Sequence, residues 1–211
     1  LPRVEELFEA RKPKSLALIS EISGTVSERE IKKVRNIIVT DPETLEEKAY
    51  PIHYGMRVKV EPGDHINKGD TITEGALNPH DILSVLGVEA VHDYLIREVQ
   101  RTYRMQGVDV NDKHIEVIVR QMCRKVRVTD SGSSDLIGGA LANRLEVENI
   151  NAELQKRIDD GEEGIKLVEY QQVLLGITKA ALANDSFLSA ASFQAVSYTH
   201  LRAHETRSNL V

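Results

Sequence analysis

Basic side chains gather between residues 120 and 127, and their chemistry suits contact with phosphate groups. They are Arg120, Arg124, Lys125 and Arg127. Guanidinium and ammonium groups neutralise the phosphates of a nucleic-acid backbone, which positions a duplex without reading its sequence. The wider segment, residues 97–127, is net positive in a chain whose formal net charge is −6. A solvated helix face is the alternative interpretation, and the residue types alone leave both open.

A run of small polar residues follows the basic cluster and consists of Ser131, Gly132, Ser133 and Ser134. Residues of this kind absorb backbone rotation at hinges, so the run predicts a hinge. It does not satisfy the G-x-S-x-G pattern of a nucleophile elbow. His200 and His204 have the i,i+4 spacing of metal ligands, but a third ligand is missing. The sequence therefore predicts no catalytic and no metal-binding residue on this chain.

The basic cluster is expected at the end of a helix. Asn111 is a good N-cap, and Asp112 lies in the first turn, where the helix dipole favours an anion. An apolar stripe at helical spacing follows, made of Ile115, Ile118, Val119 and Met122. The last turns are expected to carry Arg120, Arg124 and Lys125, and a short strand to carry Arg127. The single cysteine, Cys123, lies beside the stripe and is predicted to be buried.

Length and composition predict a folded protein from a reducing compartment. Of the 211 residues, 41% are hydrophobic but only 4% are aromatic and none is Trp, so we expect an aliphatic core. A single Cys excludes an internal disulfide framework. The sequence has no stretch with the apolar length of a membrane span and no signal-peptide pattern. Because the first residue is Leu and not Met, we expect a piece of a longer chain.

The pattern along the chain predicts an α+β fold. Short apolar runs separated by Gly and Pro turns indicate β structure, and helical periodicity follows it. The expected parts are a helix and basic turn at residues 1–15, a β module at 16–78, a helical region at 79–127, a hinge segment and polar loop at 128–172, small-residue helices at 173–194, and a tail at 195–211. Within the tail, SYTHLRAHETRSNL resembles translated adaptor sequence, so we interpret the tail as non-native.

Residues 60–75, VEPGDHINKGDTITEG, offer a different function. Their V-x-x-G-D-x-I-x-x-G-D pattern resembles the half-barrel of biotinyl and lipoyl carrier domains, in which a hairpin lysine holds the cofactor. No Met-Lys-Met-like triplet is present, and Lys68 reads more simply as a turn lysine before Gly69. A stand-alone carrier or adaptor module is therefore the alternative to a purely structural module.

Three long motifs carry a more specific resemblance. They are LPRVEELFEARKPK at residues 1–14, NDKHIEVIVRQMCRKVRVTDSGSSD at residues 111–135, and LLGITKAALANDSFLSAASFQ at residues 174–194. In this order they resemble the C-terminal part of the beta-prime subunit of bacterial DNA-directed RNA polymerase. The resemblance implies that residues 16–78 form a sandwich–barrel hybrid module of a larger multi-domain subunit. It also implies that residues 125–135 are a switch segment near DNA, with Lys179 packed beside it.

The same resemblance implies a role in transcription without chemistry on this chain. The whole enzyme is a nucleotidyltransferase whose magnesium is held by clustered aspartates, and no NADFDGD-like run occurs here. The expected partners are the beta and alpha subunits, with omega as a further candidate, and the DNA template and RNA product, but no membrane. The expected location is the bacterial cytoplasm, associated with the nucleoid.

Overall fold

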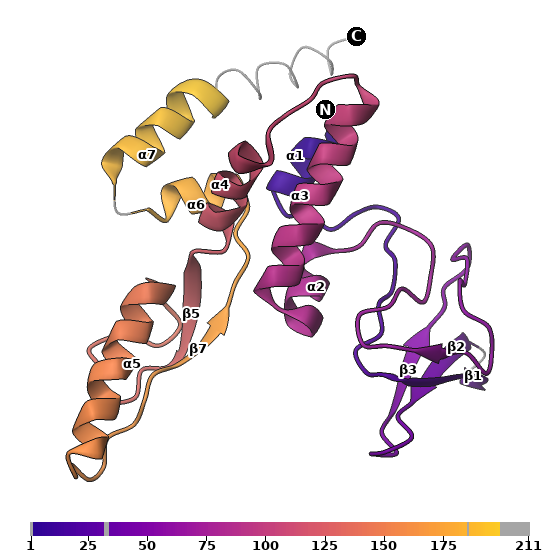
Figure 1. The fold of residues 1–211 in the computed structure, drawn as a ribbon, viewed down its shortest axis with the longest axis horizontal. Helices are drawn as coiled ribbons and strands as arrows, with labels where there is room; N and C mark the ends of the chain where they lie inside the picture. Colours follow the sequence, from indigo (N-terminus) through magenta and orange to yellow (C-terminus); the bar gives the residue numbers. More distant parts are fainter. Residues whose placement is uncertain (1, 32–33, 185, 199–211) are drawn as a thin grey trace. The chain divides into compact units, whose positions relative to one another are not determined.

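A computed structural model describes residues 2–31, 34–184 and 186–198 (Figure 1). The chain forms two compact units, Leu1–Val110 and Asn111–Val211. This boundary differs from the sequence-based division, which kept residues 79–127 together as one helical region. The helix before the boundary ends at Met105, and the next helix begins at Asp112 with its own cap at Asn111. The two helices therefore belong to different units.

A four-stranded antiparallel sheet forms the β part of the first unit. Its strands are β1 (Gly24–Ile31), β2 (Val34–Thr40), β3 (Glu47–Pro51) and β4 (His65–Ile66), in the order β3-β2-β1-β4. Side chains of these strands, namely Val26, Ile37, Val39, Tyr50 and Ile66, form a core together with Ile52 and Ile72 from the neighbouring segments. The aliphatic core and a β module at residues 16–78 were predicted from the sequence. The extent of the longest strand, β1, was not, because only its first residues alternate in burial.

Helices form the rest of the first unit. They are α1 (Pro2–Phe8), α2 (Pro79–Leu86) and α3 (Val88–Met105). Val4 and Leu7 of α1 are buried, as are Val91, Leu95 and Val99 of α3, and α1 packs against α3. Helix α2 is capped by Asn78, whose side chain accepts a hydrogen bond from the His80 N–H at 3.3 Å. Asp81 lies in the first turn of this helix, where the helix dipole favours an anion.

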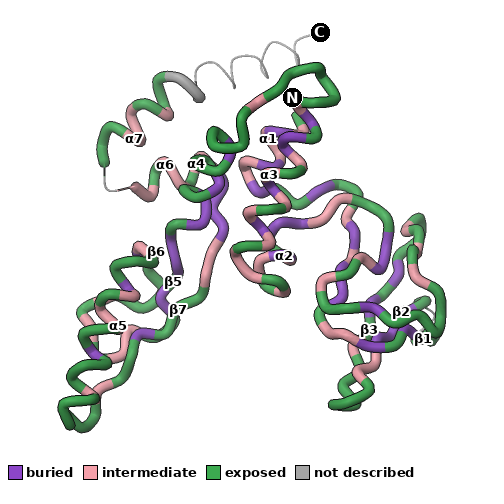
Figure 2. Tube along the Cα trace, in the orientation of Figure 1, coloured by how far each residue is buried: buried purple, intermediate pink, exposed green. Residues whose placement is uncertain are grey.

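The second unit joins helices to a three-stranded antiparallel sheet with the order β6-β5-β7. Its elements are α4 (Asp112–Met122), β5 (Lys125–Asp130), β6 (Leu141–Asn143), α5 (Arg144–Asp159), β7 (Glu169–Gln172), α6 (Ile177–Leu182), α7 (Phe187–Ser192) and the π-helix η1 (Phe193–Tyr198). The core contains Val126, Val128, Ala142, Val147, Leu154 and Val168. Figure 2 shows buried segments on both β5 and α5.

The prediction of a polar loop within residues 128–172 is wrong for residues 144–159, which form helix α5. Val147 and Leu154 are buried and Ile150 packs against the same core. These three residues are spaced at i, i+3 and i+7, which gives one narrow apolar face in an otherwise charged segment. The residues predicted as a non-native tail lie partly in η1, while residues 199–211 lie outside the described residues.

Candidate nucleic-acid interface

Helix α4 carries Arg120, the first residue of the basic cluster, and it begins where the sequence predicts. The Asn111 side chain accepts a hydrogen bond from the Lys113 N–H at 3.0 Å, which confirms the N-cap. Ile115, Val119 and Met122 are buried, whereas Ile118 lies at the margin of the stripe and is 36% exposed. One side of α4 is thus buried, and the other side faces solvent.

The helix ends earlier than predicted, at Met122, so Arg124 and Lys125 do not lie in its last turns. Cys123 is buried at the C-cap, as predicted, and this burial raises the pKa of its thiol to about 11. Lys125 is already the first residue of strand β5. Arg124 therefore lies at a corner between a helix and a strand, which we call the α4–β5 corner (residues 122–125).

Tertiary hydrogen bonds hold the α4–β5 corner. The last carbonyl groups of a helix have no N–H partner within the helix, so they need partners from elsewhere. The Met122 carbonyl accepts from the Leu175 N–H at 2.9 Å, and the Arg124 carbonyl accepts from the Arg144 N–H at 3.1 Å. The side-chain amide of Gln172 donates to the remaining two carbonyls, those of residues 123 and 125. Hydrogen bonds from three other residues therefore hold the backbone of the corner in place.

The predicted contact residues differ in their exposure. Arg120 on α4, Arg124 at the corner and Arg127 on β5 are exposed, and so is Lys179 on α6. Lys125 is only 8% exposed. Strand alternation explains the exposure of Arg127, because its neighbours Val126 and Val128 point into the core. The structure thus presents three of the four clustered basic side chains to solvent.

The exposed arginines of the cluster also differ from most arginines of the chain in their pairing. Eight arginines elsewhere form ion pairs, namely Arg3, Arg11, Arg29, Arg35, Arg57, Arg101, Arg144 and Arg157, whereas the exposed Arg97 and Arg104 of α3 form none with a described residue. Arg120, Arg124 and Arg127 form no ion pair with any residue that the structure describes. Their guanidinium groups therefore keep their full hydrogen-bonding capacity for an external anion.

The Ser/Gly loop predicted as a hinge (residues 131–134) is bonded into the second unit. Its Ser133 N–H donates to the Lys166 carbonyl at 3.0 Å, and the Lys166 N–H donates back to the Ser133 hydroxyl at 3.0 Å. The Gly132 N–H donates to the Asp130 carboxylate at 3.0 Å. Gly132 has φ +53°, and a Cβ there would lie 2.5 Å from the carbonyl oxygens of Lys166 and Leu167. The loop has one closed arrangement, and its hinge role stays a prediction.

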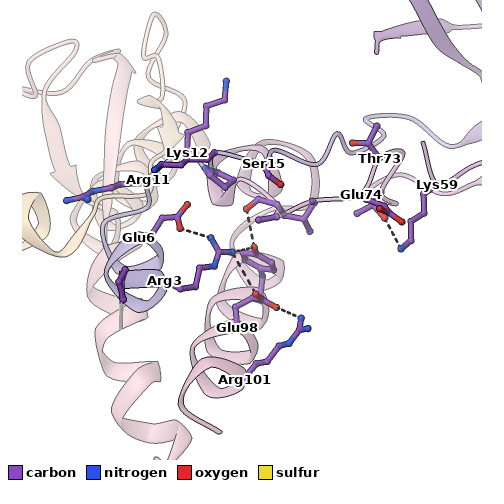
Figure 3. A pocket seen from close by; sticks show the side chains of 18 residues that line it. Arg3, Glu6, Arg11, Lys12, Ser15, Lys59, Thr73, Glu74, Glu98 and Arg101 are labelled. Carbon is purple, nitrogen blue, oxygen red and sulfur yellow. Dashed lines mark hydrogen bonds and ion pairs between the residues drawn. The ribbon is translucent and has the colours of Figure 1, made fainter. Parts of the chain in front are cut away.

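A second basic region, which the sequence did not single out as a site, lines a groove of about 950 Å³ within the first unit (Figure 3). At its centre Arg3 reaches Glu6 at 3.1 Å, Glu98 at 3.8 Å and the Tyr94 hydroxyl at 3.3 Å. Burial opposes the charge of Arg3, but the hydrogen bond to Glu6 and the nearby charges raise its pKa above the ordinary value. Arg3 thus ties α1 to α3, and no sequence pattern could reveal partners 91 residues away.

Lys68, the residue of the carrier interpretation, lies in a tight turn. Its N–H donates to the Ser23 hydroxyl at 2.8 Å, and the Asn67 N–H donates to the Asp70 carboxylate at 2.8 Å. These contacts give Lys68 a place in a structural turn. Among the described residues there is no cluster of three or more His, Cys, Asp or Glu side chains suited to a metal ion. No helix in the described ranges has the length and apolar character needed to span a membrane.

The fold and the exposed arginines define an α+β segment suited to contact with phosphate groups, and comparison with known proteins identifies its family. The family described as RNA polymerase Rpb1, domain 5, matches residues 4–185, so the chain belongs to this family. It is similar to proteins named DNA-directed RNA polymerase subunit beta′. The relative from Acetivibrio thermocellus is 60% identical over 194 residues, which are 92% of this chain and 16% of the relative.

Two further beta′ relatives agree with this assignment. The protein from Lachnoclostridium phytofermentans is 56% identical over 196 residues, or 92% of this chain and 15% of the relative. The protein from Thermoanaerobacter sp. (strain X514) is 57% identical over 194 residues, or 92% of this chain and 16% of the relative. The chain thus spans about a sixth of the length of the curated relatives that it matches. The matches do not support the alternative of a stand-alone carrier module.

Proposed function

We propose that this chain is a segment from the C-terminal part of a bacterial beta′ subunit and that it supports DNA-templated transcription by contact with the nucleic-acid backbone. The observation that carries this proposal is the set of exposed guanidinium groups of Arg120, Arg124 and Arg127 on and around the α4–β5 corner, which form no ion pair with any described residue. The names of the beta′ relatives support the assignment to a DNA-directed RNA polymerase.

The proposed contact is electrostatic and does not read sequence. The guanidinium groups project from a helix, a corner and a strand that follow one another along the chain, and hydrogen bonds hold the corner between the other two. A planar guanidinium can donate two parallel hydrogen bonds to one phosphate, which favours arginine at such sites. Lys179 is exposed on α6 and would add a further charge. Lys125 is buried, so we propose that it does not itself touch a phosphate in this arrangement.

We propose that the Ser/Gly loop is a hinge with discrete states. To open, the loop would have to break the pair of hydrogen bonds between Ser133 and Lys166. Because each such bond contributes about 1 kcal/mol net, the closed arrangement would be favoured by about 2 kcal/mol. The loop would then switch between states and would not flex continuously, which suits a segment that reports whether nucleic acid is bound.

The wider assignments are also proposals. The assembled enzyme would be a nucleotidyltransferase whose catalytic residues and magnesium lie outside this chain, in the company of the beta, alpha and omega subunits, the DNA template and the RNA product. Residues 16–78 would be its sandwich–barrel hybrid module, and the curled antiparallel sheet β3-β2-β1-β4 supports this reading. The cytoplasm, in association with the nucleoid, would be its location.

The test is the salt dependence of promoter binding by polymerase assembled with the full-length subunit. The slope of log K against log salt is negative, and each phosphate contact contributes about 1 to its magnitude. Replacing Arg120, Arg124 and Arg127 with Ala should therefore reduce this magnitude by about 3. A matched control is Arg157→Ala on α5, where the arginine is engaged by Glu162 at 2.7 Å. An unchanged slope in the triple variant would refute the proposed contact.

A further inference from the structure

The Gln172 side chain makes an unusual number of contacts for a residue at the end of a short strand. Its amide nitrogen donates to the Cys123 carbonyl at 2.8 Å, the Lys125 carbonyl at 3.1 Å and the Val173 carbonyl at 3.2 Å. A carboxamide has only two N–H groups, so at least one of them is shared between acceptors. All three acceptors are backbone carbonyls, and the first two belong to the α4–β5 corner.

The backbone of Gln172 is itself held by strand pairing, so its side chain projects from a fixed position. Gln172 lies opposite Val126 in the antiparallel pairing of β5 and β7, and Val126 is fully buried. Three residues further along the chain, the Leu175 N–H donates to the Met122 carbonyl. Residues 172–175 therefore contact the corner from the end of the helix to the start of the strand.

The carbonyls held by Gln172 lie on either side of Arg124. The Cys123 carbonyl belongs to the peptide plane that enters Arg124, and the Lys125 carbonyl belongs to the plane that leaves Lys125. Fixing both planes limits the rotation of the backbone between them, since a peptide unit moves as a rigid plane. The direction in which the Arg124 side chain leaves the backbone is thereby set, and so is the start of β5, which carries Arg127.

We propose that Gln172 is a positioning residue for phosphate contact, which orients the backbone from which the Arg124 side chain projects. This inference rests on the proposed function of the basic cluster. Gln172 itself carries no charge and touches no phosphate. Its effect on nucleic-acid binding therefore passes through Arg124, which gives it a distinctive signature in a salt titration.

The experiment compares Gln172→Met, Arg124→Ala and the double variant in polymerase assembled with the full-length subunit. Met has a similar volume but no N–H donor, so it removes the hydrogen bonds without changing the charge. Arg124→Ala should lower the salt slope of promoter binding by about 1. Gln172→Met should reduce the magnitude of this negative slope by a similar amount. In the double variant, the reduction should be no larger than the larger of the two single reductions. Gln155→Met, on the exposed face of α5, should keep the wild-type slope.

The outcomes separate the two proposals. If Arg124→Ala leaves the slope unchanged, the contact function fails, and the positioning role fails with it. If Arg124→Ala lowers the slope while Gln172→Met keeps the wild-type value, only the positioning role is overturned. Additive losses in the double variant would overturn it as well, since independent effects exclude action through Arg124. Should Gln172→Met not assemble, Gln172→Asn, which withdraws the amide by one methylene, is measured against the same expectations.

Discussion

Replacing Gly132 with Ala should strongly destabilise the closed arrangement of the Ser/Gly loop. Gly132 has φ +53°, and an Ala there would pay about 1–2 kcal/mol for the left-handed backbone. Its Cβ would also lie 2.5 Å from the carbonyl oxygens of Lys166 and Leu167. These oxygens belong to the backbone and cannot turn aside, so the two segments must separate.

Separation removes the two hydrogen bonds between Ser133 and Lys166, which contribute about 1 kcal/mol each. Gly132→Ala should therefore destabilise the closed loop by about 3–4 kcal/mol in total. Gly139→Ala is the matched control, because Gly139 has φ +83° in the same unit but no atom within 4 Å of its Cβ position. It should show only the left-handed cost of about 1–2 kcal/mol.

Amide hydrogen exchange of Ser133 and Lys166 measures this difference. An excess of about 2 kcal/mol over the control corresponds to exchange that is roughly 30-fold faster, at 1.4 kcal/mol per factor of ten. If Gly132→Ala and Gly139→Ala gave equal exchange rates at these amides, the loop would not be packed against residues 166–167 in solution. The reasoning about a two-state hinge would then be refuted.

Other predictions test the surroundings of the interface. Asn151→Leu removes two hydrogen bonds of 2.8 and 3.0 Å to the buried Val168 backbone and should speed amide exchange at Val168 by at least about tenfold, whereas Asn149→Leu on the exposed face of α5 should not. Cys123 is the single cysteine, and burial raises its pKa from 9.0 to about 11, so alkylation of the folded chain should have its midpoint near pH 11 but near 9 in urea. Because the folded state disfavours the thiolate, the folded protein keeps its full stability below pH 9. Its free energy of unfolding should then fall as the pH rises from 9 to about 11. Asn111→Ala should cost helix α4 about 1 kcal/mol, seen as faster amide exchange in its first turn.

Helix α4 could be predicted from the sequence because its signals are local. The cap at Asn111, the acidic first turn and the spacing of Ile115, Val119 and Met122 all lie within one short segment. Helix α5 was missed because its apolar face is narrow, with only Val147 and Leu154 buried among many charged residues. A narrow face is recognised only when the sheet that covers it is known.

The arginine positions of the candidate interface could be predicted, but their support could not. The charge of residues 120–127 and the alternation around Arg127 are visible in the sequence. The burial of Lys125 depends on the early end of α4, which the sequence placed too late. The role of Gln172 depends on an antiparallel pairing between segments that are 47 residues apart, and no local pattern encodes such a contact.

The pairing of β5 with β7 has a consequence for where this chain can change in length. Because Val126 lies opposite Gln172, the chain leaves the base of the second unit and returns to it at neighbouring points. Residues 127–171 lie between these two points, and the pairing at their ends does not fix how long this segment must be. Lengthening one of its turns should cost little, because doubling a flexible loop costs only about 0.6 kcal/mol. The turn at Gly161, exposed and beyond the end of α5, is the place where a reporter domain could be inserted while the α4–β5 corner keeps its shape.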